Sequence, residues 1–160
     1  QKVTLLQPVR RRSARHSRTM VSLAAAAAAT VMVAVVTVAV AAPPPMDEDM
    51  AELARTVRAA CHAESGVDLA LVERVNAGLT LPEDAALKCY ARCVMETAGM
   101  LADGEVEVEV VLALLDDATR ARNEAALRAC GTQRGADHCD TAWRTQRCWQ
   151  AANPGDYYLI

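Results

Sequence analysis

Lys88-Cys89-Tyr90-Ala91-Arg92-Cys93-Val94-Met95 is the stretch around which this chain is organised. It places two cysteines four residues apart in a run of helix-forming residues, so both sulfurs are expected on one face of a helix. The other four cysteines are Cys61, Cys130, Cys139 and Cys148. Whether the six form three disulfides decides the compartment in which the protein works and the rigidity of its core.

The first 42 residues have the pattern of a targeting segment. Six basic residues precede Met20, and an almost unbroken Ala/Val run from Val21 to Ala42 leads to three prolines. A charged flank, an apolar core and a small-residue exit are typical of a secretory signal peptide. We therefore expect residues 20–42 to be a cleaved signal and residues 1–19 to be upstream of the true start. The alternatives are an authentic N-terminal extension and a single transmembrane anchor.

The remaining domain, residues 43–160, is acidic. It holds all 20 Asp and Glu but only 11 of the 17 Lys and Arg, because six of these lie in the leader, and its net charge is −9. Such a domain repels phosphate backbones, so nucleic acid is not an expected partner. Its length suits a single domain, and an even number of cysteines behind a secretory signal implies a disulfide framework.

Apolar residues recur at helical spacing along most of this domain, which predicts an all-α fold of six helices. The expected helices run from Asp47 to near Gly66, from Asp68 to Asn76, from Pro82 to near Gly99, from Val108 to Leu115, from Ala118 to Cys130 and from about Asp137 to Ala152. Glu105 to Val110 alternates strictly, which by itself indicates a strand. We still expect a helix from Val108, because no second strand is predicted to pair with it.

Helix geometry limits how the cysteines can pair. Cys139 and Cys148 lie nine residues apart in one helix, about 13.5 Å along its axis and on opposite sides, so they cannot bond to each other. Cys89 and Cys93 have parallel side-chain directions, which are poor for a mutual bond. Excluding both pairs leaves ten of the fifteen connectivities, and each of these ties the third helix to two other segments.

The full spacing is Cys61-x27-Cys89-x3-Cys93-x36-Cys130-x8-Cys139-x8-Cys148. Local sequence adds Leu87-Lys88-Cys89-Tyr90, the Asp103-Gly104 turn, Ala129-Cys130-Gly131, Cys139-Asp140-x-Ala142 and Ala152-Asn153-Pro154 before Tyr157-Tyr158-Leu159. In these features residues 46–160 resemble the insect odorant-binding proteins, also called pheromone-binding or general odorant-binding proteins. The x3 and x8 spacings together make this resemblance specific.

The resemblance implies the disulfides Cys61–Cys93, Cys89–Cys139 and Cys130–Cys148, a pattern that helix geometry allows. It also implies a compact six-helix domain around a closed apolar cavity. Such a protein carries odorants, pheromones or other small hydrophobic molecules through sensillum lymph or haemolymph to membrane receptors. It is secreted, works as a monomer or weak homodimer, and has no stable membrane insertion once the signal is cleaved.

Carried over position by position, the family's cavity lining corresponds to Val57, Met95, Met100, Val106, Leu112, Leu115, Trp149 and Leu159. The composition fits a cavity, since the chain has no Phe and two Trp and so lacks the large aromatics that fill most cores. On composition alone, an ordinary Ala-rich solid core is the simpler interpretation. Relatives often have a hydroxyl near the Met95 and Met100 positions to hold an alcohol, and this chain does not.

Other functions find less support. A zinc site could use His62 and His138 beside the cysteines, but a secreted context favours oxidation and the usual Cys-x2-Cys pair is missing, so we predict no metal and no cofactor. Ser65 is the one serine after the leader and has no nucleophile motif around it, so we predict no enzyme. A disulfide-rich secreted interaction or inhibitor protein with no ligand cavity stays as the alternative function.

Overall fold

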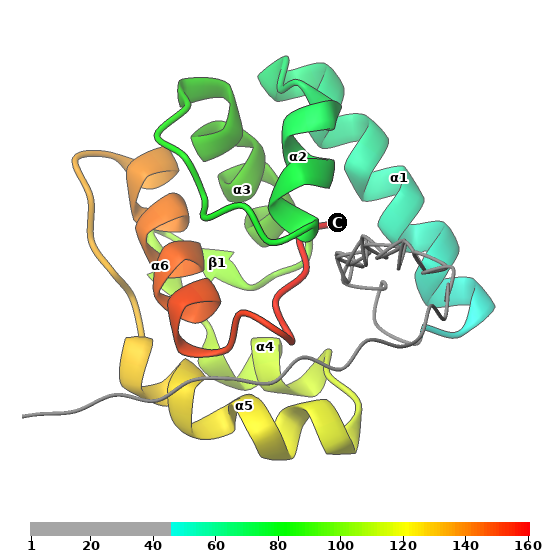
Figure 1. Cartoon of the computed structure of the whole chain (residues 1–160), viewed down its shortest axis with the longest axis vertical. Helices are drawn as coiled ribbons and strands as arrows, with labels where there is room; N and C mark the ends of the chain where they lie inside the picture. The colour runs from blue at the N-terminus through cyan, green and yellow to red at the C-terminus, as the bar shows by residue number, and fades with distance from the viewer. Residues whose placement is uncertain (1–45) are drawn as a thin grey trace, which may run out of the picture. The chain divides into compact units, whose positions relative to one another are not determined.

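The structure is a computed structural model that describes residues 46–160, so the predicted signal peptide and the residues before it lie outside the described residues. The elements are α1 (Glu48–Ser65), α2 (Leu69–Asn76), α3 (Ala85–Thr97), β1 (Leu101–Ala102), β2 (Glu105–Val106), α4 (Val108–Ala113), α5 (Asp117–Cys130) and α6 (His138–Ala152). This confirms the all-α fold with six helices (Figure 1).

Aspartates begin most of these helices. The Asp47, Asp84 and Asp137 side chains each accept a backbone N–H three residues further on, at 2.8 Å. A carboxylate at this position satisfies an N–H that has no partner inside the helix and interacts favourably with the positive end of the helix dipole. At the other end of α1, Gly66 adopts φ +68°, the left-handed conformation that commonly ends a helix.

The structure differs from the prediction at the start of α3, at the end of α4 and in a short strand that was not predicted. Pro82 lies before α3, because Asp84 is the N-cap and the helix begins at Ala85. A second strand does exist: β1 pairs antiparallel with β2 across a turn at Asp103 and Gly104, both of which have positive φ. Each strand has two residues, too few for the alternation pattern to detect. The helix predicted from Val108 is present and ends at Ala113, two residues earlier than expected.

Three disulfides hold the helices together around α3. They join Cys61 to Cys93, Cys89 to Cys139 and Cys130 to Cys148, with Cα–Cα distances of 5.5, 4.5 and 5.9 Å. These are the three pairs that the family resemblance implies. The first ties α1 to α3, the second α3 to α6, and the third α5 to α6, so the four longest helices are cross-linked and the shorter α2 and α4 are not.

The C-terminal tail packs back onto the helices. It leaves the end of α6 and runs across the molecule towards α2 (Figure 1). The Asn76 side chain holds the tail through two 2.8 Å hydrogen bonds, donating to the Leu159 carbonyl and accepting the Leu159 N–H. The Tyr90 hydroxyl donates to the Ile160 carbonyl oxygen. Leu159 is therefore part of the largest core cluster, together with Leu87, Tyr90 and residues of α1 and α2.

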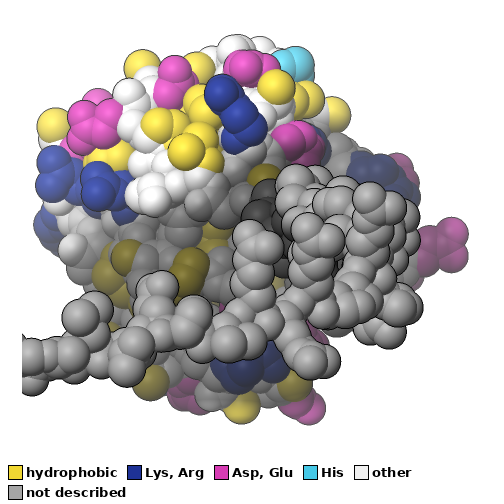
Figure 2. Space-filling view, in the orientation of Figure 1, with side chains coloured by type: hydrophobic (Ala, Val, Ile, Leu, Met, Phe, Trp, Pro, Cys, Tyr) yellow, Lys and Arg dark blue, Asp and Glu magenta, His cyan; other side chains and the backbone are white. Residues whose placement is uncertain are grey.

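The described surface is mixed in character. Figure 2 shows hydrophobic, basic and acidic side chains interspersed over the upper part of one face. Of the helices within residues 46–160, none has both the length and the hydropathy needed to cross a bilayer.

Candidate functional site

A cavity of about 150 Å³, partly open to solvent, lies between the α4–α5 segment, α6 and the C-terminal tail. One wall comes from α3's end and the α4–α5 segment, a second from α6, and a third from the tail. The lining residues are Met100, Val111, Leu115, Thr119, Asn123, Leu127, Gln146, Trp149, Asn153, Asp156, Tyr157 and Tyr158. The cavity thus has an apolar part and a polar part.

The α5 wall follows one helical stripe. Thr119, Asn123 and Leu127 lie four residues apart on α5 and line the cavity. Residues four apart share a helical face, so α5 presents this stripe to the cavity. Val111 of α4 and Leu115 of the linker before α5 extend the wall, which is therefore apolar at both ends and polar in the middle.

The polar middle is closed by a hydrogen-bonded network. Arg122 binds both Asp156 carboxylate oxygens, at 2.9 and 3.1 Å, and Asn123 donates to the same carboxylate at 3.0 Å. Asn153 donates to Asn123 at 2.7 Å. The hydrogen bond from Arg122 lowers the pKa of Asp156, so the carboxylate stays ionised and keeps the tail turn on α5.

Two of the lining residues, Trp149 and Tyr157, each have a buried polar atom without a hydrogen-bond partner within residues 46–160: the indole nitrogen and the hydroxyl oxygen. Tyr157 is 9% exposed, and burial raises the pKa of its hydroxyl, which therefore remains a neutral O–H donor. The other tryptophan and another buried tyrosine of the domain do have hydrogen-bond partners. The Trp143 indole donates to the Pro82 carbonyl at 2.9 Å, and the Tyr90 hydroxyl donates to Ile160.

The predicted lining residues separate into two groups. Met100, Leu115 and Trp149 line the cavity, and Val106 and Leu112 pack in the cluster beside it. Met95 lies in a neighbouring cluster with Leu101 and Ala142, while Val57 and Leu159 lie in the largest core cluster. Met100 and Trp149 contact all three clusters, so they stand where the solid core meets the cavity. Ligand contact by these residues remains a prediction.

Sequence reasoning did not find the polar lining. The pattern of cysteines and apolar residues did not single out these five polar lining residues: Thr119, Asn123, Gln146, Asn153 and Asp156. A signal was present, since Thr119 and Asn123 continue the apolar spacing of α5 and Gln146 and Asn153 flank Trp149 at helical intervals. The two tyrosines of the tail gave no periodic signal, because the tail is not helical.

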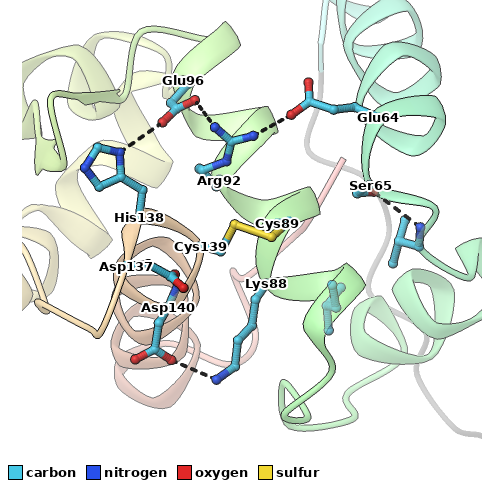
Figure 3. Close-up of a disulfide and its surroundings, with 12 residues drawn as sticks. Glu64, Ser65, Lys88, Cys89, Arg92, Glu96, Asp137, His138, Cys139 and Asp140 are labelled. Atoms are coloured by element: carbon cyan, nitrogen blue, oxygen red, sulfur yellow. Dashed lines mark hydrogen bonds and ion pairs between the residues drawn. A yellow bond between two sulfur atoms is a disulfide. The ribbon is translucent and has the colours of Figure 1, made fainter.

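The opposite side of α6 is fixed to α3. Beside the Cys89–Cys139 bond, Lys88 donates to Asp140 at 2.7 Å, and a chain of charged groups runs from Glu64 through Arg92 and Glu96 towards His138 (Figure 3). Asp140 also accepts from Arg144 at 2.7 Å. Hydrogen bonds from Lys88 and then Arg144 strongly lower the pKa of Asp140.

A second hollow of about 550 Å³ lies along α6, away from the first cavity. Its charged lining consists of Arg134, Arg144, Arg147 and Glu83, and Trp143 forms part of its wall. Arg134 is paired with Glu105, and Arg144 with Asp140. The lining of this groove is more polar and more highly charged than that of the cavity between α5, α6 and the tail.

These features define a disulfide-stapled, all-α domain with a partly apolar cavity beside its core. The chain belongs to the PBP/GOBP family, whose model matches residues 45–152. General odorant-binding protein 56a of Drosophila melanogaster is 32% identical over 110 residues, covering 68% of this chain and 79% of that protein.

Solved structures show the same fold. Odorant binding protein 5 of Apis mellifera matches with a TM-score of 0.65 at 17% identity, covering 74% of this chain and 100% of its own. Fatty acid binding protein OBP56a from the oral disk of the blowfly Phormia regina matches with a TM-score of 0.58 at 26% identity, covering 70% of this chain and 98% of its own. The resemblance stated from the cysteine spacing is therefore confirmed.

Proposed function

We propose that the domain is an extracellular carrier that binds small hydrophobic molecules in the cavity between α5, α6 and the tail. The observation that carries this proposal is the cavity itself, which lies beside the core of a cross-linked domain and has walls of Met100, Leu115, Leu127 and Trp149. Met adapts its shape to different ligands, and an indole ring provides a large apolar face. Relatives named as odorant-binding and fatty acid binding proteins support the same kind of cargo.

The volume limits the size of the cargo. A cavity of about 150 Å³ in another protein holds a benzene ring, whereas pockets for drug-sized ligands are typically about 300–1,000 Å³. This domain therefore suits compact, ring-sized molecules in the conformation described. A longer molecule would have to displace Met100 or the tail, whose turn is held by Arg122 and Asp156.

Secretion and delivery to a membrane receptor belong to the same proposal. All six cysteines are in disulfides, which persist in oxidising compartments such as sensillum lymph or haemolymph. The net charge of −9 keeps a carrier soluble and apart from other acidic surfaces. We propose that the carrier works as a monomer or weak homodimer.

Titration with toluene, followed by protein NMR, tests the proposal. In the unmodified protein, the NMR signals of cavity residues are expected to change with toluene concentration until they reach saturation. Trp149→Ala should bind about tenfold more weakly, because a large apolar contact is lost, while all three disulfides remain. Leu53→Ala is the control, since Leu53 is 55% exposed on α1 and should leave affinity unchanged. Absence of saturable binding by the unmodified protein would refute the carrier, and unchanged affinity in Trp149→Ala would remove this residue from the site.

A further inference from the structure

The second hollow along α6 differs in charge from the domain as a whole. Its volume of about 550 Å³ lies within the range of pockets that hold small molecules, about 300–1,000 Å³. Three of the 11 Lys and Arg residues in residues 43–160 line it, together with one acidic residue, Glu83. The lining therefore has a net charge of +2, in a domain whose net charge is −9. A concave surface with an excess of one sign concentrates ions of the opposite sign, so this hollow attracts anions.

Two of the lining arginines, Arg144 and Arg147, are neighbours on the surface of α6. They lie three residues apart, and residues at this spacing share a helical face. Both are exposed. Arg144 donates to the Asp140 carboxylate through Nε, at 2.7 Å, so its two terminal NH₂ groups lie outside this bond. Arg144 is thus held on the helix by one edge of its guanidinium group, and the outer end can pair with a ligand.

Arg147 is restrained by an aromatic ring. Its guanidinium carbon lies 4.8 Å from the centre of the Trp143 ring, and the Lys88 ammonium nitrogen lies 4.2 Å from the same centre. The Trp143 side chain is buried and donates to the Pro82 carbonyl, so it provides a fixed support. Within residues 46–160, Arg147 forms no ion pair. Its charge is therefore available to an acidic group brought by a ligand.

We propose that the second hollow along α6 binds small organic anions, and that Arg144 and Arg147 pair with the oxygens of a carboxylate or phosphate group. A guanidinium group presents N–H donors in a fork that matches these oxyanions, and such charge-assisted hydrogen bonds are stronger than neutral ones. The hollow and the cavity between α5, α6 and the tail share no lining residue. This inference therefore does not depend on the proposed carrier function.

Other classes of ligand match this hollow less well. A neutral hydrocarbon gains nothing from the arginines, and a cation is repelled by them. A nucleic acid would extend beyond the hollow over a domain of net charge −9, which repels it. An acidic protein surface carries the same carboxylates, but a small anion is favoured because the basic residues line a concave site instead of spreading over a flat face.

Titration of the full chain with benzoate, phenyl phosphate and toluene tests the inference. The three probes share a ring, and only toluene is uncharged. The indole NMR signal of Trp143 reports on the hollow, because Arg147 covers its ring, and that of Trp149 reports on the cavity. Benzoate and phenyl phosphate are each expected to shift the Trp143 signal in a saturable way, and toluene should leave it in place. Raising the salt concentration about tenfold should weaken binding of both anions several-fold.

Four variants show which side chains bind the anion. Arg144→Gln and Arg147→Gln each remove one cation and should raise the dissociation constant of benzoate about fivefold. Glu83→Gln removes the acidic residue of the lining and should lower this constant about twofold. Arg55→Gln is the matched control, because it changes the net charge by the same amount at an exposed position on α1 that does not line the hollow. It should leave the dissociation constant unchanged.

The outcomes separate the anion site from the carrier function. If neither anion shifts the Trp143 signal, or if Arg147→Gln and Arg55→Gln have the same dissociation constant, the anion site is overturned. A benzoate shift at Trp149 alone would place the anion in the cavity and would overturn it as well. Binding of hexaglutamate at the hollow more than tenfold tighter than either small anion would assign the site to an acidic protein partner instead. Toluene binding is measured at Trp149, so each of these results leaves the carrier function to its own test.

Discussion

The two junctions that α6 makes differ in how completely the space between the elements is filled. We call the contact between α3 and α6 the stapled junction; it contains Cys89–Cys139, the Lys88–Asp140 ion pair and the Trp143–Pro82 hydrogen bond. We call the contact of α6 with α5 and the tail the cavity junction; it contains Cys130–Cys148, Trp149 and Tyr157. The first is joined by an ion pair and hydrogen bonds across it, and the second contains a cavity of about 150 Å³.

The difference indicates that the two sides of α6 have different roles. A hollow region loses dispersion contacts and would tend to collapse if its walls could move. Cross-linking α6 to α3 on one side and to α5 on the other restrains both walls of the cavity. Stability is therefore expected to depend mainly on the stapled junction and ligand selection mainly on the cavity junction.

Removal of a disulfide should have the largest effect. The Cys89–Cys139 bond spans 50 residues and the Cys130–Cys148 bond spans 18, so loop-closure entropy predicts losses of about 4 and about 3 kcal/mol respectively when each pair is changed to Ala. Denaturant unfolding measures these losses. Ligand affinity should show the opposite order, because Cys130–Cys148 holds α5 against α6. The comparison fails if the Cys89/Cys139 variant loses more affinity than the Cys130/Cys148 variant.

Asp140→Asn should come next. The carboxylate accepts hydrogen bonds from Lys88 and Arg144 at 2.7 Å and lies at the stapled junction, so its loss is expected to cost about 2 kcal/mol of unfolding free energy. Asp117→Asn is the matched control, because its side chain is fully exposed and its contact with Arg120 is 3.4 Å, and it should change nothing measurable. If Asp140→Asn and Asp117→Asn lower the unfolding free energy equally, the ion pair of Asp140 contributes no more than an exposed surface pair.

The same carboxylate predicts an acid dependence. The pKa of Asp140 in the folded protein lies below its unfolded value of about 3.9, so its contribution is complete above that value. As the pH falls, the unfolded chain takes up the proton first, and the unfolding free energy decreases until the native carboxyl is protonated too. Asp140→Asn should flatten this decrease below pH 4, as seen in denaturant titrations at several pH values. If the unfolding free energy falls with pH at the same rate in Asp140→Asn and in the unmodified protein, other groups cause the acid dependence.

The smallest effect should come from two matched tyrosine substitutions. Tyr90→Phe removes a hydroxyl that is bonded to Ile160 and should lower the unfolding free energy by about 1 kcal/mol. Tyr157→Phe removes a buried hydroxyl without a partner among the described residues, so stability should stay the same or rise slightly. Thermal unfolding of the two variants, compared with the unmodified protein, checks both. A clear loss in Tyr157→Phe would mean that its hydroxyl is paired in the free protein.

The sequence predicted the stapled junction better than the cavity junction. Cysteine spacing, aspartate caps and helical periodicity are local patterns, and they led to the six helices and, through the family resemblance, to the three disulfides. The pair of two-residue strands was missed because it is shorter than any periodic signal. Val57 and Leu159, which the family resemblance predicts to line the cavity, lie in the largest core cluster, and their contact with a ligand stays a prediction.

The polar side of the cavity depends on contacts between segments far apart in the chain. Asp156 reaches Arg122 and Asn123 only because the turn after α6 folds back onto α5. Tyr157 becomes buried for the same reason. No local pattern encodes that return, so the polar lining of the cavity could be found only from the structure.

The two tryptophans allow the most direct test. Trp149 lines the cavity, and Trp143 lines the second hollow along α6, whose lining includes Arg134, Arg144 and Arg147. The chain has no other tryptophan. A nitrogen–proton NMR spectrum therefore contains two indole signals, which Trp143→Phe assigns. Titration with toluene is predicted to shift the Trp149 signal in a saturable way and to leave the Trp143 signal in place. A shift of the Trp143 signal alone, or no shift of either, would contradict binding in the cavity between α5, α6 and the tail.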